Sequence, residues 1–574
     1  MLDILFVVPS SKPALRQESN GTLLLATILK QKSINTDICR FHEADMTQGF
    51  NSFVNETVQN ILTRKPCIVS FYCRCDCFLA NIKIAEKLKE ADSNIIIIFG
   101  GPQADALSLE TISTLPFVDY CCSGEGETTI YPLVKALLAK EDTTHIAGLT
   151  YRTKEGQVKE NPRPALIKDI NDLSHIDYSI IPADIMDAEK NPEILIETGR
   201  GCPFNCAYCS SSIFWQRTFR SKSPERIVDE IENLYNSYGF RVFTFPNDLF
   251  TVNKKQVMAF CEELRKRQLD IRWICSSRVD TLDEEVIRCM AQAGLKKVFL
   301  GIESGSERIQ KAIHKNINRD KVLEICRTLK KYGVTTVSSF MYGFPDETEA
   351  DLELTAQLAS EIYSMGLTQI QFHLCAILPG TEFYNTYKDE LSFAQTQSNI
   401  VGDFGVAENM DFINEHLELF PFYFEYSSPL RKDFACFEDI IPACLFLYSK
   451  MIFLHNENFS NISLLGLYKD IYKANRELFT DSTRKPDNYS LIFNYLSANY
   501  SGETLQKLLE IFSFEKTLSE FKKEKQMTFD ARSFSIDIRA YQNKKTLSEI
   551  TAKPVMVYFQ KKGRKLSFII KDLG

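Results

Sequence analysis

Three cysteines in one short stretch are the residues most able to do chemistry in this sequence. Cys202, Cys206 and Cys209, here called the cluster cysteines, are spaced C-x3-C-x2-C in ETGRGCPFNCAYCSSS, directly after the apolar segment EILIE. Thiolates at this spacing on one loop can bind a single iron–sulfur cluster. Three ligands leave one iron of a [4Fe-4S] cluster open, and an open coordination position is a reaction site. The spacing therefore predicts a reactive cluster.

Other interpretations of the cysteines are open at this point. The cluster cysteines could be reduced thiols in a structural loop, or zinc ligands, although no nearby His or Cys supplies a fourth zinc ligand. Cys73, Cys75 and Cys77 alternate around a predicted strand end and could form a second metal site. Buried thiols are the default for these three, and for the adjacent pair Cys121 and Cys122.

The elements that would position the cluster cysteines alternate between strands and helices. Between Glu193 and Leu378, six apolar strand segments are each followed by a helix or a long connection. This alternation predicts a complete or partial βα barrel with functional groups at the strand ends. Before it, near-continuous apolar segments such as NIIIIF alternate with amphipathic helices, which is typical of a doubly wound parallel sheet covered on both faces.

The 574 residues are too many for one hydrophobic core, so several domains are expected. We predict an α/β domain over residues 1–145, a linker rich in Pro and Asp over 146–185, and a partial (β/α)6 barrel over 186–390. Residues 391–574 are predicted to be a mainly helical cover or substrate domain, with a few strands at the end.

Two glycine-bearing turns follow strands of the first predicted domain. Gly100 and Gly101 follow NIIIIF, and Gly124 and Glu125 begin the sequence GEGE after FVDYCCS. Glycine lets a ligand approach the backbone closely, and open α/β sheets bind ligands at such strand ends. The turns predict either a cofactor crevice or tight turns without a ligand.

Composition excludes several classes of partner. A net charge of −8 gives no clustered basic surface for nucleic acid or anionic membrane, and no apolar run approaches the roughly 20 residues that span a bilayer. The first residues lack the basic region and cleavage site of a signal peptide. With 17 cysteines and no export signal, we expect a cytoplasmic protein with reduced thiols.

The cysteine motif, with Gly199, Arg200 and Gly201 before it and Tyr208 inside it, resembles the radical S-adenosylmethionine (SAM) superfamily. The resemblance implies that SAM chelates the open iron and is cleaved to a 5′-deoxyadenosyl radical by an electron from a reductant such as flavodoxin or ferredoxin. It also implies SAM contacts from Tyr208, Asp248, Ser277, Arg278 and Glu303. One position departs from the family pattern, because Asn247 stands where the first acid of Asp-Asp-x-Phe is usual.

The first domain resembles the cobalamin-binding domain that precedes many radical SAM barrels. The matching positions are Pro9, Ser70, Gly100, Gly101, Pro102 and the residues Gly124, Glu125, Gly126 and Glu127. The Asp-x-His-x-x-Gly sequence that supplies a histidine to cobalt is absent, and His42 has no such context. The resemblance therefore implies base-off cobalamin without a protein histidine, or loss of cobalamin binding.

These resemblances favour a cobalamin-dependent radical SAM methyltransferase acting on an unactivated carbon of a peptide or small natural product. The alternatives are a radical rearrangement, cyclisation or epimerisation without methyl transfer, and a non-catalytic iron–sulfur electron carrier. No residue identifies the substrate. Cys375, Tyr342 and Cys275 are candidates to quench a product radical near the barrel mouth.

Overall fold

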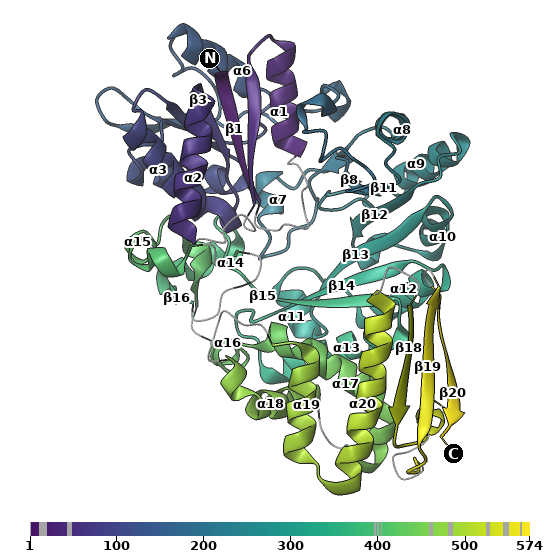
Figure 1. Ribbon diagram of the computed structural model, residues 1–574. Helices are drawn as coiled ribbons and strands as arrows, with labels where there is room; N and C mark the ends of the chain where they lie inside the picture. The colour runs from purple at the N-terminus through teal and green to yellow at the C-terminus, as the bar shows by residue number, and fades with distance from the viewer. Residues whose placement is uncertain are drawn as a thin grey trace. The chain divides into compact units, whose positions relative to one another are not determined.

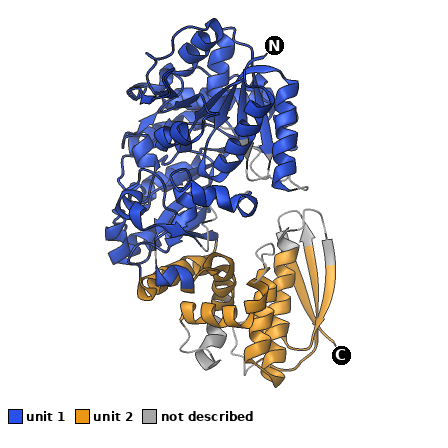
Figure 2. Cartoon of the chain, turned by 90° about the vertical axis from the view of Figure 1, so that its left-hand side faces the viewer, with its two compact units in different colours: residues 1–347, 367–432 blue, residues 348–366, 433–574 orange. Residues whose placement is uncertain are grey.

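The protein is described by a computed structural model that forms two compact units (Figure 2). One unit comprises residues 1–347 and 367–432, and the other comprises 348–366 and 433–574. The described residues are 2–10, 20–42, 49–394, 398, 401–402, 405–426, 428–458, 463–479, 486–523, 528–542, 550–562 and 565–573. In this part of the chain, no helix is both long enough and apolar enough to cross a membrane.

The first sheet has seven strands in the order β2-β1-β3-β4-β5-β6-β7. Strands β1 to β5 are parallel, whereas β6 and β7 are antiparallel additions at one edge. The strands are β1 (Leu2–Ser10), β2 (Thr36–His42), β3 (Pro66–Tyr72), β4 (Ile96–Gly100), β5 (Tyr120–Cys122), β6 (Leu149–Arg152) and β7 (Val158–Glu160). The doubly wound sheet is confirmed, but it continues to residue 160, into the segment that we predicted to be a linker from 146.

Helices cover both faces of this sheet (Figure 1). The helices are α1 (Asn20–Gln31), α2 (Phe50–Thr63), α3 (Phe78–Ala91), α4 (Pro102–Ala106), α5 (Ser108–Thr114) and α6 (Ile130–Ala139). Helix α2 packs against α3, and α1 packs against α6. Two buried faces explain why the strand sequences are apolar throughout instead of alternating.

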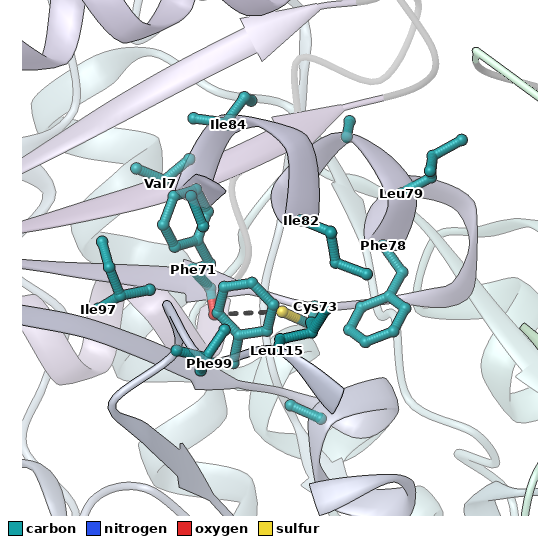
Figure 3. Close-up of a cluster of buried hydrophobic side chains, with 14 of the residues drawn as sticks. Val7, Phe71, Cys73, Phe78, Leu79, Ile82, Ile84, Ile97, Phe99 and Leu115 are labelled. Atoms are coloured by element: carbon teal, nitrogen blue, oxygen red, sulfur yellow. Dashed lines mark hydrogen bonds between the residues drawn. The ribbon is translucent and has the colours of Figure 1, made fainter. Parts of the chain in front are cut away.

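The core on the α2–α3 side is dominated by aromatic and branched side chains (Figure 3). The rings of Phe71 on β3 and Phe99 on β4 pack edge to face, with their centroids 5.3 Å apart. The ring centroid of Phe78 on α3 lies 6.1 Å from that of Phe99. A segment that follows the barrel in sequence also packs into this core, because the ring centroid of Phe420 lies 6.0 Å from that of Phe78. Residues 391–432 therefore belong to the first unit and not to the C-terminal region predicted over 391–574.

The second sheet has six parallel strands in the order β15-β14-β13-β12-β11-β8, which confirms the partial barrel. The strands are β8 (Glu193–Leu195), β11 (Val242–Thr244), β12 (Arg272–Ser277), β13 (Leu295–Glu303), β14 (Thr335–Tyr342) and β15 (Thr368–Leu374). The helices after them are α8 (Pro224–Tyr238), α9 (Lys254–Lys266), α10 (Glu284–Gln292), α11 (Glu307–Ala312), α12 (Arg319–Lys331) and α13 (Glu349–Met365), of which α13 lies in the second unit.

Side-chain caps fix where the barrel helices begin. Ser223, Asn253, Asp283 and Asn318 each accept a hydrogen bond from a backbone N–H in the first turn of α8, α9, α10 and α12. Such caps satisfy amide groups that have no partner inside the helix. The caps therefore define the residue at which each of these four helices begins.

Shorter elements complete the first unit. They are β9 (Gly199–Arg200), α7 (Ser211–Phe214), β10 (Arg220–Ser221), α14 (Glu382–Tyr387), β16 (Ser392–Phe393), α15 (Met410–Glu415), β17 (Phe424–Glu425) and most of α16 (Pro429–Asp433). Strand β9 pairs with β10 in an antiparallel hairpin, and β16 pairs with β17.

The second unit is mainly helical, as predicted, and ends in an antiparallel sheet of order β18-β19-β20. Its elements are α17 (Phe437–Asn458), α18 (Leu464–Ala474), α19 (Asn488–Asn499), α20 (Gly502–Lys523), β18 (Thr528–Phe534), α21 (Ile538–Gln542), β19 (Val555–Lys562) and β20 (Lys565–Asp572). Residues 563–564, between the last two strands, lie outside the described residues.

Candidate functional site

The cluster cysteines lie on the long connection of the β9–β10 hairpin, and we call residues 201–219 the cluster loop. Gly201 begins it with φ +80°, and a Cβ there would overlap the carbonyl oxygen of Thr218. The backbone N–H of Cys209 donates to the carbonyl of Cys206 at 3.1 Å, which folds the motif into a turn. Only glycine tolerates both the positive φ and the close approach, so Gly201 is needed to close the loop at its base.

The thiols of the cluster cysteines are partly exposed and lie beside a positive charge. A guanidinium N–H of Arg278, at the end of β12, donates to Sγ of Cys206 at 3.7 Å. Burial raises the pKa of Cys202 and raises that of Cys209 to about 11, so these thiols need a metal or a cation to ionise. Accessible sulfur beside a guanidinium fits the binding of an anionic thiolate cluster.

No three His, Cys, Asp or Glu side chains among the residues that the structure describes lie close enough together to hold one ion. The geometry therefore does not support zinc at the cluster cysteines, or a second metal site at Cys73, Cys75 and Cys77. A [4Fe-4S] cluster spreads its thiolates over separate irons, so its ligands lie farther apart than those of one ion.

A buried ion pair lies beside the cluster loop at the end of β13. Nζ of Lys315 is 2.6 Å from Oε1 of Glu303, and the hydroxyl of Tyr208 donates to the same oxygen at 3.0 Å. Glu303 is only 6% exposed and has φ +68°, next to an irregularity in the β13–β14 register. Left-handed backbone at a non-glycine residue is unfavourable and concentrates at functional sites.

The glycine before Glu303 makes room for this pair. A Cβ at Gly301 would lie 2.6 Å from Oε1 of Glu303 and 2.9 Å from Nζ of Lys315. The Gly-x-Glu order in GIESG therefore has a steric cause. Sequence reasoning predicted Glu303 and Tyr208 but missed Lys315, which follows the short helix α11 with no local pattern to distinguish it from other lysines.

Arg278 links the ends of β12 and β13 to the cluster loop. Its guanidinium forms two 2.9 Å hydrogen bonds with Asp280, donates to the carbonyl of Lys315 at 2.9 Å and lies 3.8 Å from the ring centre of Phe204. Ser277, in contrast, is buried among hydroxyl groups, with its Oγ 2.5 Å from Oγ1 of Thr251. Arg278 therefore lies among the cluster-loop contacts, whereas Ser277 stabilises the strand end beneath it.

The end of β11 contributes one acid and one amide with different roles. Asp248 accepts a hydrogen bond from Oγ of Ser211 at 2.7 Å, and burial raises the pKa of its carboxyl group. Asn247 accepts from Thr198 at 2.8 Å and donates to the carbonyl of Gly199, so it fixes the start of the cluster hairpin. Asn247, which stands where the family pattern usually has an acid, therefore has a structural role in this chain.

A cavity of about 700 Å³ joins the strand ends of the first sheet to the cluster loop. It is lined by six predicted site residues: Ser70, Gly100, Gly101, Gly124, Glu125 and Asp248. Trp215 and Ser211 line it from the cluster loop. Residues of both glycine turns therefore line one cavity, whereas Tyr208, Ser277, Arg278 and Glu303 are not among its lining residues.

The carboxylate of Glu125 is already bound by the protein. Its Oε1 accepts from Arg200 at 2.6 Å, and its Oε2 accepts from Arg220 and from the backbone N–H of Ile167, both at 2.7 Å. Although burial opposes ionisation, the hydrogen bonds from the two arginines lower the pKa of Glu125 below its usual value. A direct contact between this carboxylate and a cofactor would compete with these hydrogen bonds.

The predicted radical-quenching residues are all buried. Cys375 and Tyr342 are 0% and 1% exposed, and Cys375 belongs to the apolar cluster against which Tyr208 packs. Cys275 lies on the same side of β12 as Trp273, whose ring packs against Phe260 of α9. Cys275 therefore points toward the helical layer, which argues against its prediction at the barrel mouth, whereas Cys375 stays a prediction.

Comparisons with known proteins agree with this geometry. The sequence profile of the radical SAM superfamily matches residues 196–359. The chain is 30% identical over 392 residues to a protein named uncharacterized methyltransferase PH0819 from Pyrococcus horikoshii, covering 67% of this chain and 83% of that one. It is 29% identical to the anaerobic magnesium-protoporphyrin IX monomethyl ester cyclase of Rubrivivax gelatinosus, covering 53% of this chain and 56% of the cyclase.

Two solved structures share the fold. The cobalamin-dependent SAM radical enzyme OxsB superposes with a TM-score of 0.58 at 15% identity, covering 90% of this chain and 75% of that chain. The radical SAM methyltransferase TsrM of Kitasatospora setae superposes with a TM-score of 0.55 at 14% identity, covering 68% of this chain and 77% of TsrM. At these identities the likeness concerns the fold alone.

The partial barrel, the cluster motif at its first strand end and the relatives together define an iron–sulfur enzyme that uses SAM. The chain belongs to the radical SAM superfamily. Membership implies a [4Fe-4S] cluster and SAM as cofactors.

Proposed function

We propose that the chain is a cobalamin-dependent radical SAM methyltransferase that acts on an unactivated carbon of a peptide or small natural product. The observation that carries the proposal is the cavity, because it joins the glycine turns of the first sheet to the loop of the cluster cysteines. A corrin bound at the strand ends would be held beside the cluster loop, because Ser211 and Trp215 of that loop line the same cavity within one compact unit. None of the described residues that line this cavity is a histidine, which fits base-off cobalamin.

The names of related proteins support the proposal in two ways. Several relatives carry the name methyltransferase or methylase, including the hopanoid C-3 methylase of Methylococcus capsulatus at 24% identity. Of the two solved neighbours, OxsB is a cobalamin-dependent enzyme and TsrM was solved with cobalamin bound. The support for cobalamin thus comes from fold likeness together with the lined cavity.

When bound, the cluster with SAM supplies a 5′-deoxyadenosyl radical and cobalamin supplies a transferable methyl group. The cluster cysteines would hold the iron. Glu303 and Lys315 would offer a carboxylate and an ammonium to the polar groups of SAM, and Tyr208 would orient Glu303. The buried side chains around them would exclude water, which strengthens these contacts and protects a radical from side reactions.

Anaerobic reconstitution tests the proposal. The chain is incubated with iron, sulfide and hydroxocobalamin, desalted, and measured by metal analysis and absorption spectroscopy. We expect about four irons and about one cobalt per chain. Retention of iron without cobalt would overturn the cobalamin part of the proposal and leave the radical SAM part intact.

A radical cyclisation is the second candidate, because three curated cyclases are 27–30% identical to the chain. Product analysis after reduction by flavodoxin, ferredoxin or dithionite separates the two. Methyl transfer yields S-adenosylhomocysteine in addition to 5′-deoxyadenosine, because one SAM donates the methyl group and another donates the radical. A cyclase would yield 5′-deoxyadenosine and methionine alone.

A further inference from the structure

A buried ion network ties the first sheet to the base of the cluster loop. Arg200 and Arg220 are opposite each other in the β9–β10 ladder, so they mark the two ends of the loop. Glu125, which lies between β5 and α6, binds both guanidinium groups, at 2.6 and 2.7 Å. One carboxylate of the first sheet therefore holds both strands from which the cluster loop emerges.

Other side chains complete the network and leave little freedom at the loop base. Arg200 also contacts Glu127 at 2.6 Å and Glu197 at 2.9 Å. The guanidinium groups of Arg200 and Arg220 lie 5.8 and 5.5 Å from the ring centre of Trp215, which belongs to the cluster loop. The planar guanidinium group of Arg200, held by three carboxylates, has a defined orientation that a single flexible ion pair lacks. Arg220 donates to Glu125 and to the carbonyl of Ile167.

Burial makes this contact more than a surface ion pair. The side chains of Glu125 and Arg200 are 2% and 4% exposed, and that of Arg220 is 8% exposed. Ion pairs shielded from water are screened little by salt, and removal of one partner leaves an uncompensated buried charge. The network is therefore suited to fix the hairpin against the GEGE turn.

We propose that Glu125 is a positioning residue that clamps both ends of the cluster loop, so that the geometry of the SAM site depends on a side chain of the first sheet. The role is distinct from binding a corrin, because the carboxylate oxygens are already engaged by protein donors. The inference rests on the radical SAM part of the proposed function and is independent of cobalamin.

The test compares Glu125→Gln with the parent chain after iron and sulfide reconstitution. Glu230→Gln is the matched control, because Glu230 is a buried carboxylate paired with Lys222 at 3.1 Å and contacts neither Arg200 nor Arg220. Hydrogen exchange is measured on peptides of residues 201–219, and SAM binding is measured by equilibrium dialysis. The electron paramagnetic resonance spectrum of the reduced cluster with SAM is recorded as well.

For Glu125→Gln we expect about tenfold faster exchange in the cluster loop and about tenfold weaker SAM binding, with iron content retained. The cluster signal should also change its response to SAM, whereas Glu230→Gln should match the parent in all three measurements. Parent-like exchange and SAM affinity in Glu125→Gln would overturn the proposal, as would equal changes in Glu230→Gln. Loss of cobalt binding alone would count against the proposed function and leave this inference untouched.

A second variant covers a failure of Glu125→Gln to fold. Arg220→Lys keeps the positive charge but loses the planar fork, so one end of the loop should loosen. Relative to the parent chain, we expect a larger increase in hydrogen exchange at residues 210–219 than at residues 201–208. Parent-like exchange at both ends of the loop in this variant would contradict the clamp.

Discussion

The first unit contains two groups of three closely spaced cysteines in different surroundings. Cys202, Cys206 and Cys209 lie partly exposed on a loop with charged neighbours. Cys73 and Cys77 follow β3 at 0% and 3% exposure, and their sulfurs lie 3.7 and 3.6 Å from backbone carbonyls (Figure 3 shows Cys73). Close spacing alone therefore does not make a metal site, because the surroundings decide whether thiolates can form.

Burial and charge explain the difference. Burial raises the pKa of Cys77 to about 12 and that of Cys73 well above its usual value. Asn81 donates to both of these sulfurs as a neutral amide. Near the cluster loop, Arg278 places a guanidinium against Cys206 instead. A cationic neighbour stabilises thiolate, which is the form that binds iron.

The largest expected effect comes from removing one cluster cysteine. Cys202→Ala, Cys206→Ala and Cys209→Ala should each lose the cluster and reductive SAM cleavage, because a [4Fe-4S] cluster needs all of its protein thiolates. The controls are Cys75→Ala and Cys77→Ala, which should keep about four irons per chain. Iron analysis and 5′-deoxyadenosine formation check this, and SAM cleavage by any of the first three variants would refute the ligand assignment.

Thiol alkylation sharpens the same comparison in the chain prepared without iron. With a pKa of about 12, Cys75 and Cys77 are thiolate in only about one molecule in 10⁴ at pH 8. Iodoacetamide should label Cys209, whose pKa burial raises only to about 11, about tenfold faster than Cys75 and Cys77. Between pH 7 and pH 9 the slow labelling should rise about tenfold per pH unit, because deprotonation increases with pH below the pKa. Peptide mass spectrometry gives the site-specific rates, and equal rates would contradict the assigned burial.

A substitution of Lys315 tests whether the charged residues near the cluster loop contribute to SAM binding. Lys315→Met removes the ammonium 2.6 Å from Glu303 and leaves a buried carboxylate without its cation. Loss of one charge-assisted hydrogen bond is worth about 1.5–3 kcal/mol, so SAM binding should weaken at least about tenfold with the cluster retained. The exposed Lys311→Met is the control. Unchanged SAM affinity in a folded Lys315→Met chain would remove this residue from the site.

The sequence was sufficient to predict the two parallel sheets and the motif-bearing positions. Long apolar strands alternating with helices are the strongest periodic signal a chain carries. The C-x3-C-x2-C motif and GIESG each occupy one short stretch of chain, so their geometry is local. The cavity was also predictable, since glycine turns at the carboxyl ends of parallel strands must meet at one edge of the sheet.

Contacts over long sequence separations could not be predicted. Glu125 and Arg220 are 95 residues apart, and the strands β9 and β10 that align the two arginines have only two residues each. Strands of that length show no alternation to detect. The hairpin of β6 and β7 was assigned to the linker and not to the first sheet for a related reason, because its strands have only four and three residues between polar turns.

The smallest expected effect concerns stability and completes the comparison of the cysteine groups. Cys73→Ala removes a fully buried sulfur from the α2–α3 side of the first core, where it packs near Phe71 and Phe99. Small deletions of buried volume cost about 1 kcal/mol because the surrounding core does not fully close. Cys202→Ala, on the partly exposed loop, should change the unfolding free energy of the iron-free chain by less than about 0.5 kcal/mol. Denaturant unfolding of both variants measures this difference, and a larger loss for Cys202→Ala would mean that the loop cysteine is part of the packed core.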